Sequence, residues 1–177
     1  MARIRLLDDV QRSTARFDPA RRYRYTLLRV WDAALPRLCC CMLNPSTADI
    51  DQDDPTVARC GRFARAWGCG SLEVVNIFAL RATDPRKLYK AADPIGPEND
   101  AAILAAARRA DIFLAAWGNH GALLDRGQRV LTRLLARDIA PHCLAITKQG
   151  QPKHPLYTRS NSRPMPLHPS ALSAPLR

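Results

Sequence analysis

Four polar segments of the sequence carry residue types suited to ligand binding, and each follows an apolar run of strand length. Between them they hold asparagine, histidine, hydroxyl and lysine side chains. The segments are residues 44–49, 76–81, 117–121 and 148–157. Amide and imidazole groups both donate and accept hydrogen bonds. Together the segments predict a site for an anionic, nucleotide-bearing ligand.

Each of these residues also has a plain structural interpretation. Asn44 before proline is typical of a turn after a strand, and His154 before proline also fits an exposed loop. His120 stands between two glycines, which fits a pocket or a turn equally well. Asn76 differs because it lies inside an apolar strand, and a buried amide needs hydrogen-bond partners.

The elements that position these segments alternate between strand and helix. Apolar runs predict strands over residues 38–43, 72–78, 112–117 and 143–147, with a further strand over 23–31. Alternating strands and helices favour a parallel sheet covered by helices. We therefore expect a three-layer α/β/α sandwich with a mainly parallel four-stranded core sheet and an extra N-terminal edge strand. Ligands of such folds bind outside the carboxyl ends of the strands.

Domain organisation follows from the same pattern. Residues 1–22 are predicted to form a basic arm or short helix, residues 23–160 a single α/β domain, and residues 161–177 an irregular tail. Asp54 and Pro55 are a good start for a helix, because aspartate caps and proline is tolerated at the first position. A later helix is expected from about residue 122 to 138.

Charge and cysteine content indicate partners and compartment. The 27 Lys and Arg residues exceed the 16 Asp and Glu residues by eleven, which favours a nucleic acid or nucleotide partner. Arginine-rich coding in a GC-rich genome is an equally good explanation. The six cysteines include no C-x-x-C pair, so we expect no metal, no cofactor and a reduced, cytoplasmic protein. We expect no membrane partner, because no apolar run is long enough to span a bilayer. We also expect a monomer.

Several motifs, in order along the chain, carry a family resemblance. They are Asn44-Pro45-Ser46-Thr47-Ala48, Asp54-Pro55-Thr56, residues 76–85, Gly96-Pro97-Glu98-Asn99-Asp100 and His154-Pro155-Leu156-Tyr157. From about residue 23 to 160 the sequence resembles the uncharacterised family called domain of unknown function 1643. That family implies no activity.

The order of motifs also resembles, more distantly, the uracil-DNA glycosylase superfamily. Asn44-Pro45, Asn76, Trp117-Gly118 and a late His-Pro pair would be the matching positions. The resemblance implies hydrolysis of an N-glycosidic bond on a flipped base. His154 would then stabilise the departing base and Asn44 would place the water. His168, in a second His-Pro pair, competes with His154 for this role.

Ligand-binding residues follow from the same resemblance and from their side-chain chemistry. Asn76 would read a base edge, Phe78 would stack a base, and Arg81 and Lys153 would hold phosphates. The full predicted set of binding residues is Ser46, Asp49, Asn76, Phe78, Arg81, Asn119, His120 and Lys153. Two alternatives stay open: a non-catalytic nucleic-acid or nucleotide-binding module, and a Mg²⁺-dependent phosphoester hydrolase using the acidic loop 49–54.

Overall fold

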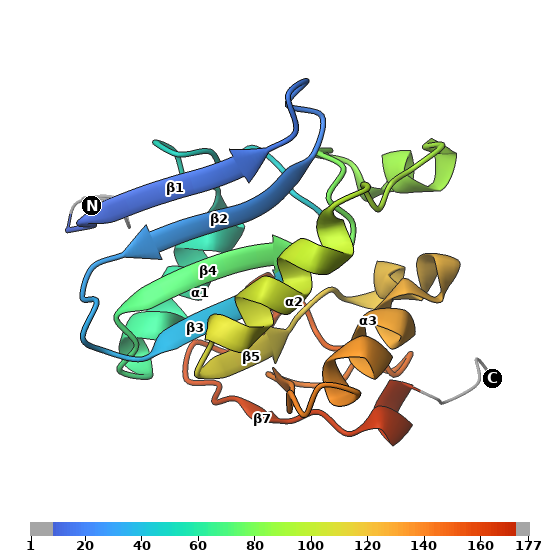
Figure 1. The fold of residues 1–177 in the computed structure, drawn as a ribbon. Coiled ribbons are helices and arrows are strands. Elements are labelled where there is room, and N and C mark those ends of the chain that lie inside the picture. Colours follow the sequence, from blue (N-terminus) through green and yellow to red (C-terminus); the bar gives the residue numbers. More distant parts are fainter. Residues whose placement is uncertain (1–8, 173–177) are drawn as a thin grey trace.

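The computed structural model describes residues 9–172 as a mixed α/β fold built on one seven-stranded sheet (Figure 1). The strand order is β1-β2-β4-β3-β5-β6-β7. The strands are β1 (Arg12–Phe17), β2 (Arg24–Val30), β3 (Arg37–Met42), β4 (Ser71–Asn76), β5 (Ile112–Ala115), β6 (His142–Cys143) and β7 (Met165–Pro166). The helices are α1 (Pro55–Ala66), α2 (Asn99–Arg109) and α3 (Arg126–Leu135), with 3-10 helices η1 (Pro85–Lys90), η2 (Asn119–Asp125), η3 (Pro155–Tyr157) and η4 (Pro169–Leu172).

The four strands predicted as the core are parallel neighbours at the centre of the sheet. β3 pairs in parallel with both β4 and β5, and β5 pairs in parallel with β6. β2 runs antiparallel to β4, as the sequence indicates for residues 23–31. The carboxyl ends of the four parallel strands therefore lie at one edge of the sheet, and their following segments are neighbours there.

The structure of the N-terminal segment differs from the predicted arm or short helix. Part of residues 1–22, expected to form an arm or short helix, forms strand β1, which pairs antiparallel with β2 and makes β2 an inner strand rather than an edge. The sequence hides β1 because none of its residues is buried, so no strong apolar alternation marks it. Residues 1–8 of this predicted segment lie outside the described part of the chain.

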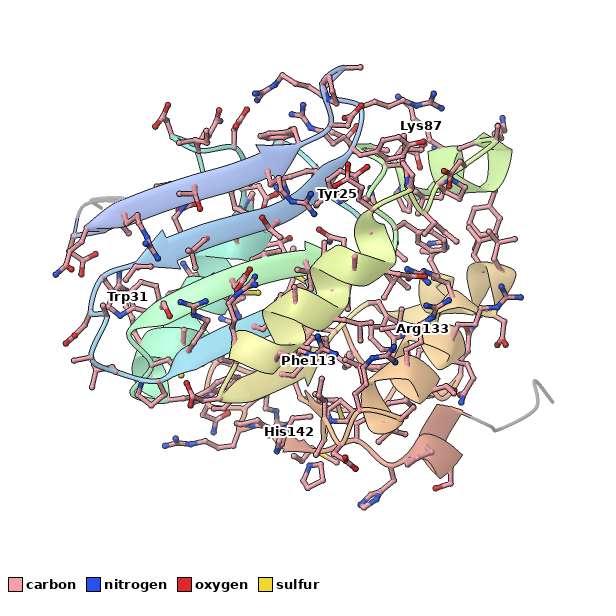
Figure 2. The ribbon with its side chains drawn as sticks, viewed as in Figure 1. Tyr25, Trp31, Lys87, Phe113, Arg133 and His142 are labelled. Atoms are coloured by element: carbon pink, nitrogen blue, oxygen red, sulfur yellow. The ribbon has the colours of Figure 1, made fainter. Side chains whose placement is uncertain are left out.

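Two hydrophobic clusters flank the sheet. Alternate residues of a strand point to opposite faces, so Cys39 and Cys41 pack on one face while Cys40 packs on the other. The first cluster holds the buried apolar residues of α2 and α3, and Phe113 of β5 belongs to it (Figure 2). The second holds those of α1. In Figure 1, α2 and α3 lie in front of the sheet and α1 lies behind it.

Helix boundaries agree with the sequence at α1 and differ at α3. Asp54 caps α1 by accepting a hydrogen bond from the backbone N–H of Val57 at 2.8 Å, with Pro55 as the first residue of the helix. The helix expected over residues 122–138 is shorter, because Leu124 and Asp125 both have φ of 55° and break it. The segment before α3 is the 3-10 helix η2 instead.

The C-terminal segment contains more structure than expected. Met165 and Pro166, predicted to be irregular, form β7 against β6, and η4 follows. Residues 173–177 of the predicted tail lie outside the described residues. Across residues 9–172 every helix is too short or too polar to cross a membrane.

Candidate functional site

The carboxyl ends of the parallel strands open into a cleft of about 870 Å³. This volume is within the usual range for small-molecule sites. Of the ten residues predicted to act in a site, seven line this cleft. They are Asn44, Ser46, Asn76, Asn119, His120, Lys153 and His154. They come from segments spread over more than a hundred residues, which the parallel topology brings together.

The other three predicted residues do not line the cleft. Phe78 is completely buried in the first hydrophobic cluster, so it cannot stack a base there. Arg81 donates to the backbone oxygen of Arg21 at 3.1 Å, and its guanidinium lies over the ring of Phe17. Asp49 forms an ion pair with Arg21 at 2.5 Å. The structure gives all three residues packing or pairing partners away from the cleft.

Asn44 is held in one orientation by backbone oxygens of the following residue and of the segment after β4. Its Nδ2 donates to the backbone oxygens of Ala82 at 2.8 Å and Pro45 at 3.1 Å. Among the described residues Oδ1 has no recorded partner, and Asn44 lines the cleft. The amide therefore offers an acceptor to water or a ligand, as positioning a water molecule requires.

Asn76 can offer a ligand the NH₂ group of its side-chain amide but not the oxygen, which already accepts a hydrogen bond. It is the last residue of β4 and is 2% exposed. Its Oδ1 accepts a hydrogen bond from Nη2 of Arg24 at 3.4 Å, whereas no partner for Nδ2 is recorded within residues 9–172. The backbone oxygen of Asn76 accepts from Nδ2 of Asn99 at 2.9 Å, which fixes the end of β4.

Arg24 is a cleft residue that the sequence analysis missed. It begins β2, lines the cleft and is 2% exposed. Its Nη1 donates to the backbone oxygen of Ala48 at 2.8 Å. Burial lowers the pKa of Arg24 to about 10, although Asp54 opposes this shift. The guanidinium therefore stays positively charged at neutral pH.

His154 is a neutral hydrogen-bond donor that lines the cleft in the segment after β6. Its Nδ1 accepts from the backbone N–H of Leu156 at 3.3 Å, which places the ring proton on Nε2. Burial lowers the pKa of His154 below its ordinary value, and Asp54 partly opposes the shift. The competing residue His168 is exposed after β7 and does not line the cleft.

The rim near His154 is aromatic and basic. The ring of Tyr157 lies 5.6 Å from that of His154 and is 73% exposed. His120 accepts or donates at Nδ1 with the hydroxyl of Tyr89 at 2.9 Å. Lys148 also lines the cleft on this side. An exposed tyrosine and a histidine at the rim supply the flat surfaces that a nucleobase stacks on.

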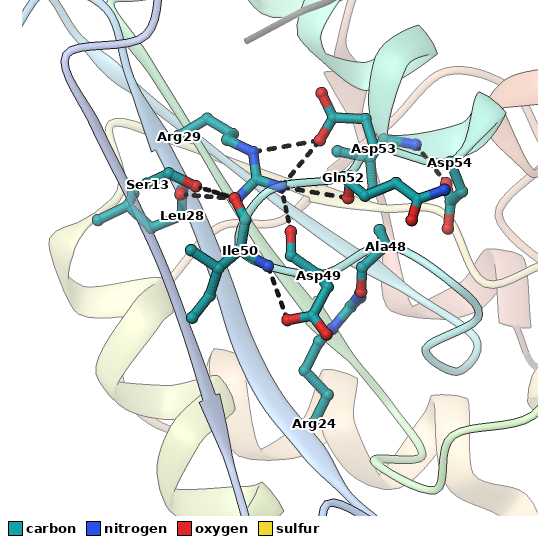
Figure 3. A network of polar contacts seen from close by, with 11 residues as sticks. Ser13, Arg24, Leu28, Arg29, Ala48, Asp49, Ile50, Gln52, Asp53 and Asp54 are labelled. Atoms are coloured by element: carbon teal, nitrogen blue, oxygen red, sulfur yellow. Dashed lines mark hydrogen bonds and ion pairs between the residues drawn. The ribbon is translucent and has the colours of Figure 1, made fainter.

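Buried arginines hold the acidic loop that follows β3 (Figure 3). Arg29 of β2 is fully buried, and its guanidinium pairs with Asp53 at 3.0 Å. It also donates to the backbone oxygens of Asp49 at 2.5 Å and Gln52 at 3.4 Å. In the part of the chain that is described, no three Asp, Glu, His or Cys side chains group as metal ligands. The contacts of Arg29 give this arginine a structural role in fixing the loop.

Trp117 fixes the segment after β5. Its ring is buried and its Nε1 donates to Oε1 of Gln151 at 3.0 Å. A Cβ at Gly121 would lie 2.0 Å from Cδ1 of Trp117, and one at Gly127 would lie 2.7 Å from Nε1. The two glycines make room for the indole, which in turn orders the Gly118 to His120 side of the cleft.

The family-model comparison assigns the chain to a family. The model described as "Protein of unknown function (DUF1643)" matches residues 24–156, so the chain belongs to this family, as its motifs predict. No curated protein and no solved structure matches the chain. The more distant resemblance to uracil-DNA glycosylases stays a prediction from motif order.

Proposed function

We propose that the protein hydrolyses an N-glycosidic bond of a nucleobase held in the cleft. The observation that carries the proposal is that His154 and Asn44 line the same cleft. His154 presents a neutral Nε2–H, and Asn44 presents a fixed Oδ1, on one cleft. Bond cleavage needs these two functions: a donor to the departing base and an acceptor that orients the water.

In the proposed hydrolysis, the attacking water and residues of this cleft account for each bond and each proton. The water oxygen held by Asn44 bonds to the anomeric carbon, and the bond between that carbon and the base nitrogen breaks. The electron pair stays on the base, where the Nε2–H of His154 donates a hydrogen bond to it. The proton lost by the water passes to solvent or to the Asp54 carboxylate, which also lines the cleft.

The surroundings of His154 suit a nucleobase. Tyr157 replaces Phe78 as the residue expected to stack the base, because its ring is exposed beside His154.

The proposal includes a three-layer, uracil-DNA-glycosylase-like arrangement of the helices and sheet. It also includes a cytoplasmic, monomeric protein.

Base release from a panel of substrates tests the proposal. The protein is incubated with DNAs that contain uracil, mismatched or modified bases, and with free nucleotides. Abasic sites are detected by alkaline cleavage, and free bases by chromatography. Release above the protein-free rate from any substrate supports the proposal, and no release from any of them contradicts it.

The second candidate is a non-catalytic nucleic-acid or nucleotide-binding module, favoured by the net charge of +11. Such a module binds more weakly as salt rises, since binding releases counterions. Salt-dependent binding without any product distinguishes it from the enzyme. The remaining alternative, a Mg²⁺-dependent phosphoester hydrolase, has less support because Arg29 and Arg21 pair with two of the loop's carboxylates.

A further inference from the structure

The buried arginines of the described chain differ in their counter-ions. Arg29 pairs with Asp53 at 3.0 Å, and Arg126 pairs with Asp100 at 2.6 Å. Arg24 is as deeply buried, yet no carboxylate within residues 9–172 lies within ion-pair distance of it. A buried charge is unfavourable unless a counter-ion compensates it. Because Arg24 lines the cleft, a bound anion can supply that counter-ion.

Arg24 also keeps hydrogen-bond donors for such an anion. Each terminal guanidinium nitrogen carries two hydrogens, and one on each is used, by Ala48 and by Asn76. The recorded contacts leave one N–H group on each terminal nitrogen, and Nε is buried without a recorded partner among the described residues, so the guanidinium keeps donors that an anion can use. Nδ2 of Asn76 is a further donor beside them. This end of the cleft is therefore rich in donors.

The charge of the cleft indicates which anion fits. Its charged lining residues are Arg24, Lys148, Lys153 and Asp54, an excess of two positive charges. A phosphate monoester carries about −1.5 to −2 at neutral pH, whereas a carboxylate or an internal phosphodiester carries −1. Ser46, Thr56 and Thr83, which carry hydroxyl groups, also line the cleft. Lys148 and Lys153 lie toward His154, so this balance describes the cleft as a whole, whose excess positive charge matches that of a phosphate monoester.

We infer that Arg24 and Asn76 form a subsite for the phosphate monoester of a mononucleotide. The nucleobase then lies at the His154 end, an assignment that rests on the proposed function. Arg24 and Asn76 belong to β2 and β4, whereas His154 follows β6. Neighbouring strands lie about 4.8 Å apart, so the two ends leave room for a sugar above β3, where Asn44 lies. The subsite selects a free nucleotide over a base within a nucleic-acid strand.

Calorimetric titration tests the subsite without relying on catalysis. The probes are inorganic phosphate, uridine, uridine 5′-monophosphate and a single-stranded oligonucleotide without terminal phosphates. The wild-type protein should bind inorganic phosphate, and should bind the monophosphate at least tenfold more tightly than uridine. Arg24→Gln should remove phosphate binding and this preference. Arg24→Lys, which keeps the charge and loses the guanidinium, should retain part of both.

Arg29→Lys is the matched control, because Arg29 lies on the same strand, also holds the loop, and does not line the cleft. It should bind phosphate like the wild type, with circular dichroism checking the fold of every variant. Three results would overturn the inference. They are no phosphate binding by the wild type, a folded Arg24→Gln variant that binds phosphate unchanged, and an oligonucleotide that binds more tightly than the monophosphate. A negative base-release assay with positive phosphate binding rejects the proposed reaction and leaves the subsite supported.

Discussion

Replacing Arg29 by methionine should destabilise the fold strongly. In the network of Figure 3 its guanidinium is fully buried and pairs with Asp53, whose side chain is 8% exposed. Removing the cation leaves a buried carboxylate without compensation. Breaking a buried ion pair from one side costs about 3–5 kcal/mol. The variant also leaves the backbone oxygens of Asp49 and Gln52 without this donor, so the upper part of that range is expected.

Urea denaturation at pH 7 measures this loss as a change in the free energy of unfolding. The total for a domain is about 5–15 kcal/mol, so the variant should unfold at much lower urea. Adding Asp53→Asn should recover part of the loss, because a neutral amide is less costly to bury. Burial raises the pKa of Asp53 and Arg29 opposes this rise, so the single variant should lose less stability at pH 4, where Asp53 takes up a proton. A loss below about 1 kcal/mol at pH 7, or no recovery in the double variant, would refute the reasoning.

Three further predictions follow from buried groups. Gly121→Ala should cost about 1–3 kcal/mol in urea denaturation, because its Cβ would overlap Trp117. Burial lowers the pKa of His154 in the folded protein below its ordinary 6.5. As the pH falls, His154 therefore takes up a proton in the unfolded chain before it does so in the folded protein. The stability that neutral His154 contributes above pH 6.5 is lost as the pH falls toward its folded pKa. His154→Gln should flatten that part of the pH–stability curve. All six cysteines are buried, and burial raises the pKa of Cys39 and Cys41, so a thiol reagent should label none of them in the native protein at pH 7 and all of them in urea.

The core of the fold could be predicted from the sequence because its signals are local. Apolar runs such as 38–43 mark buried parallel strands, and Asp54 with Pro55 marks the start of α1. Strand β1 could not be predicted, because an edge strand without buried residues lacks the apolar pattern. The break before α3 also carries no sequence signal, since Leu124 is an unusual residue at positive φ.

The cleft was partly predictable for the same reason. The residues that directly follow parallel strands, such as Asn44 and Asn76, must meet at one edge of the sheet. Phe78 was placed wrongly because its position two residues beyond β4 does not reveal which way the chain turns. Arg24 was missed because it lies on an antiparallel strand, and its burial depends on long-range packing against the loop at Ala48. A buried arginine cannot be told from a surface arginine by composition.

The central claim is that His154 acts on a nucleobase within the cleft, and base release by two histidine variants tests it most directly. His154→Ala should lower the rate by about two orders of magnitude, as expected when a donor to a developing negative charge is removed. His168→Ala is the matched control, since His168 also precedes a proline but is exposed outside the cleft. It should keep the wild-type rate. An unchanged rate for His154→Ala, or a loss confined to His168→Ala, would contradict the account.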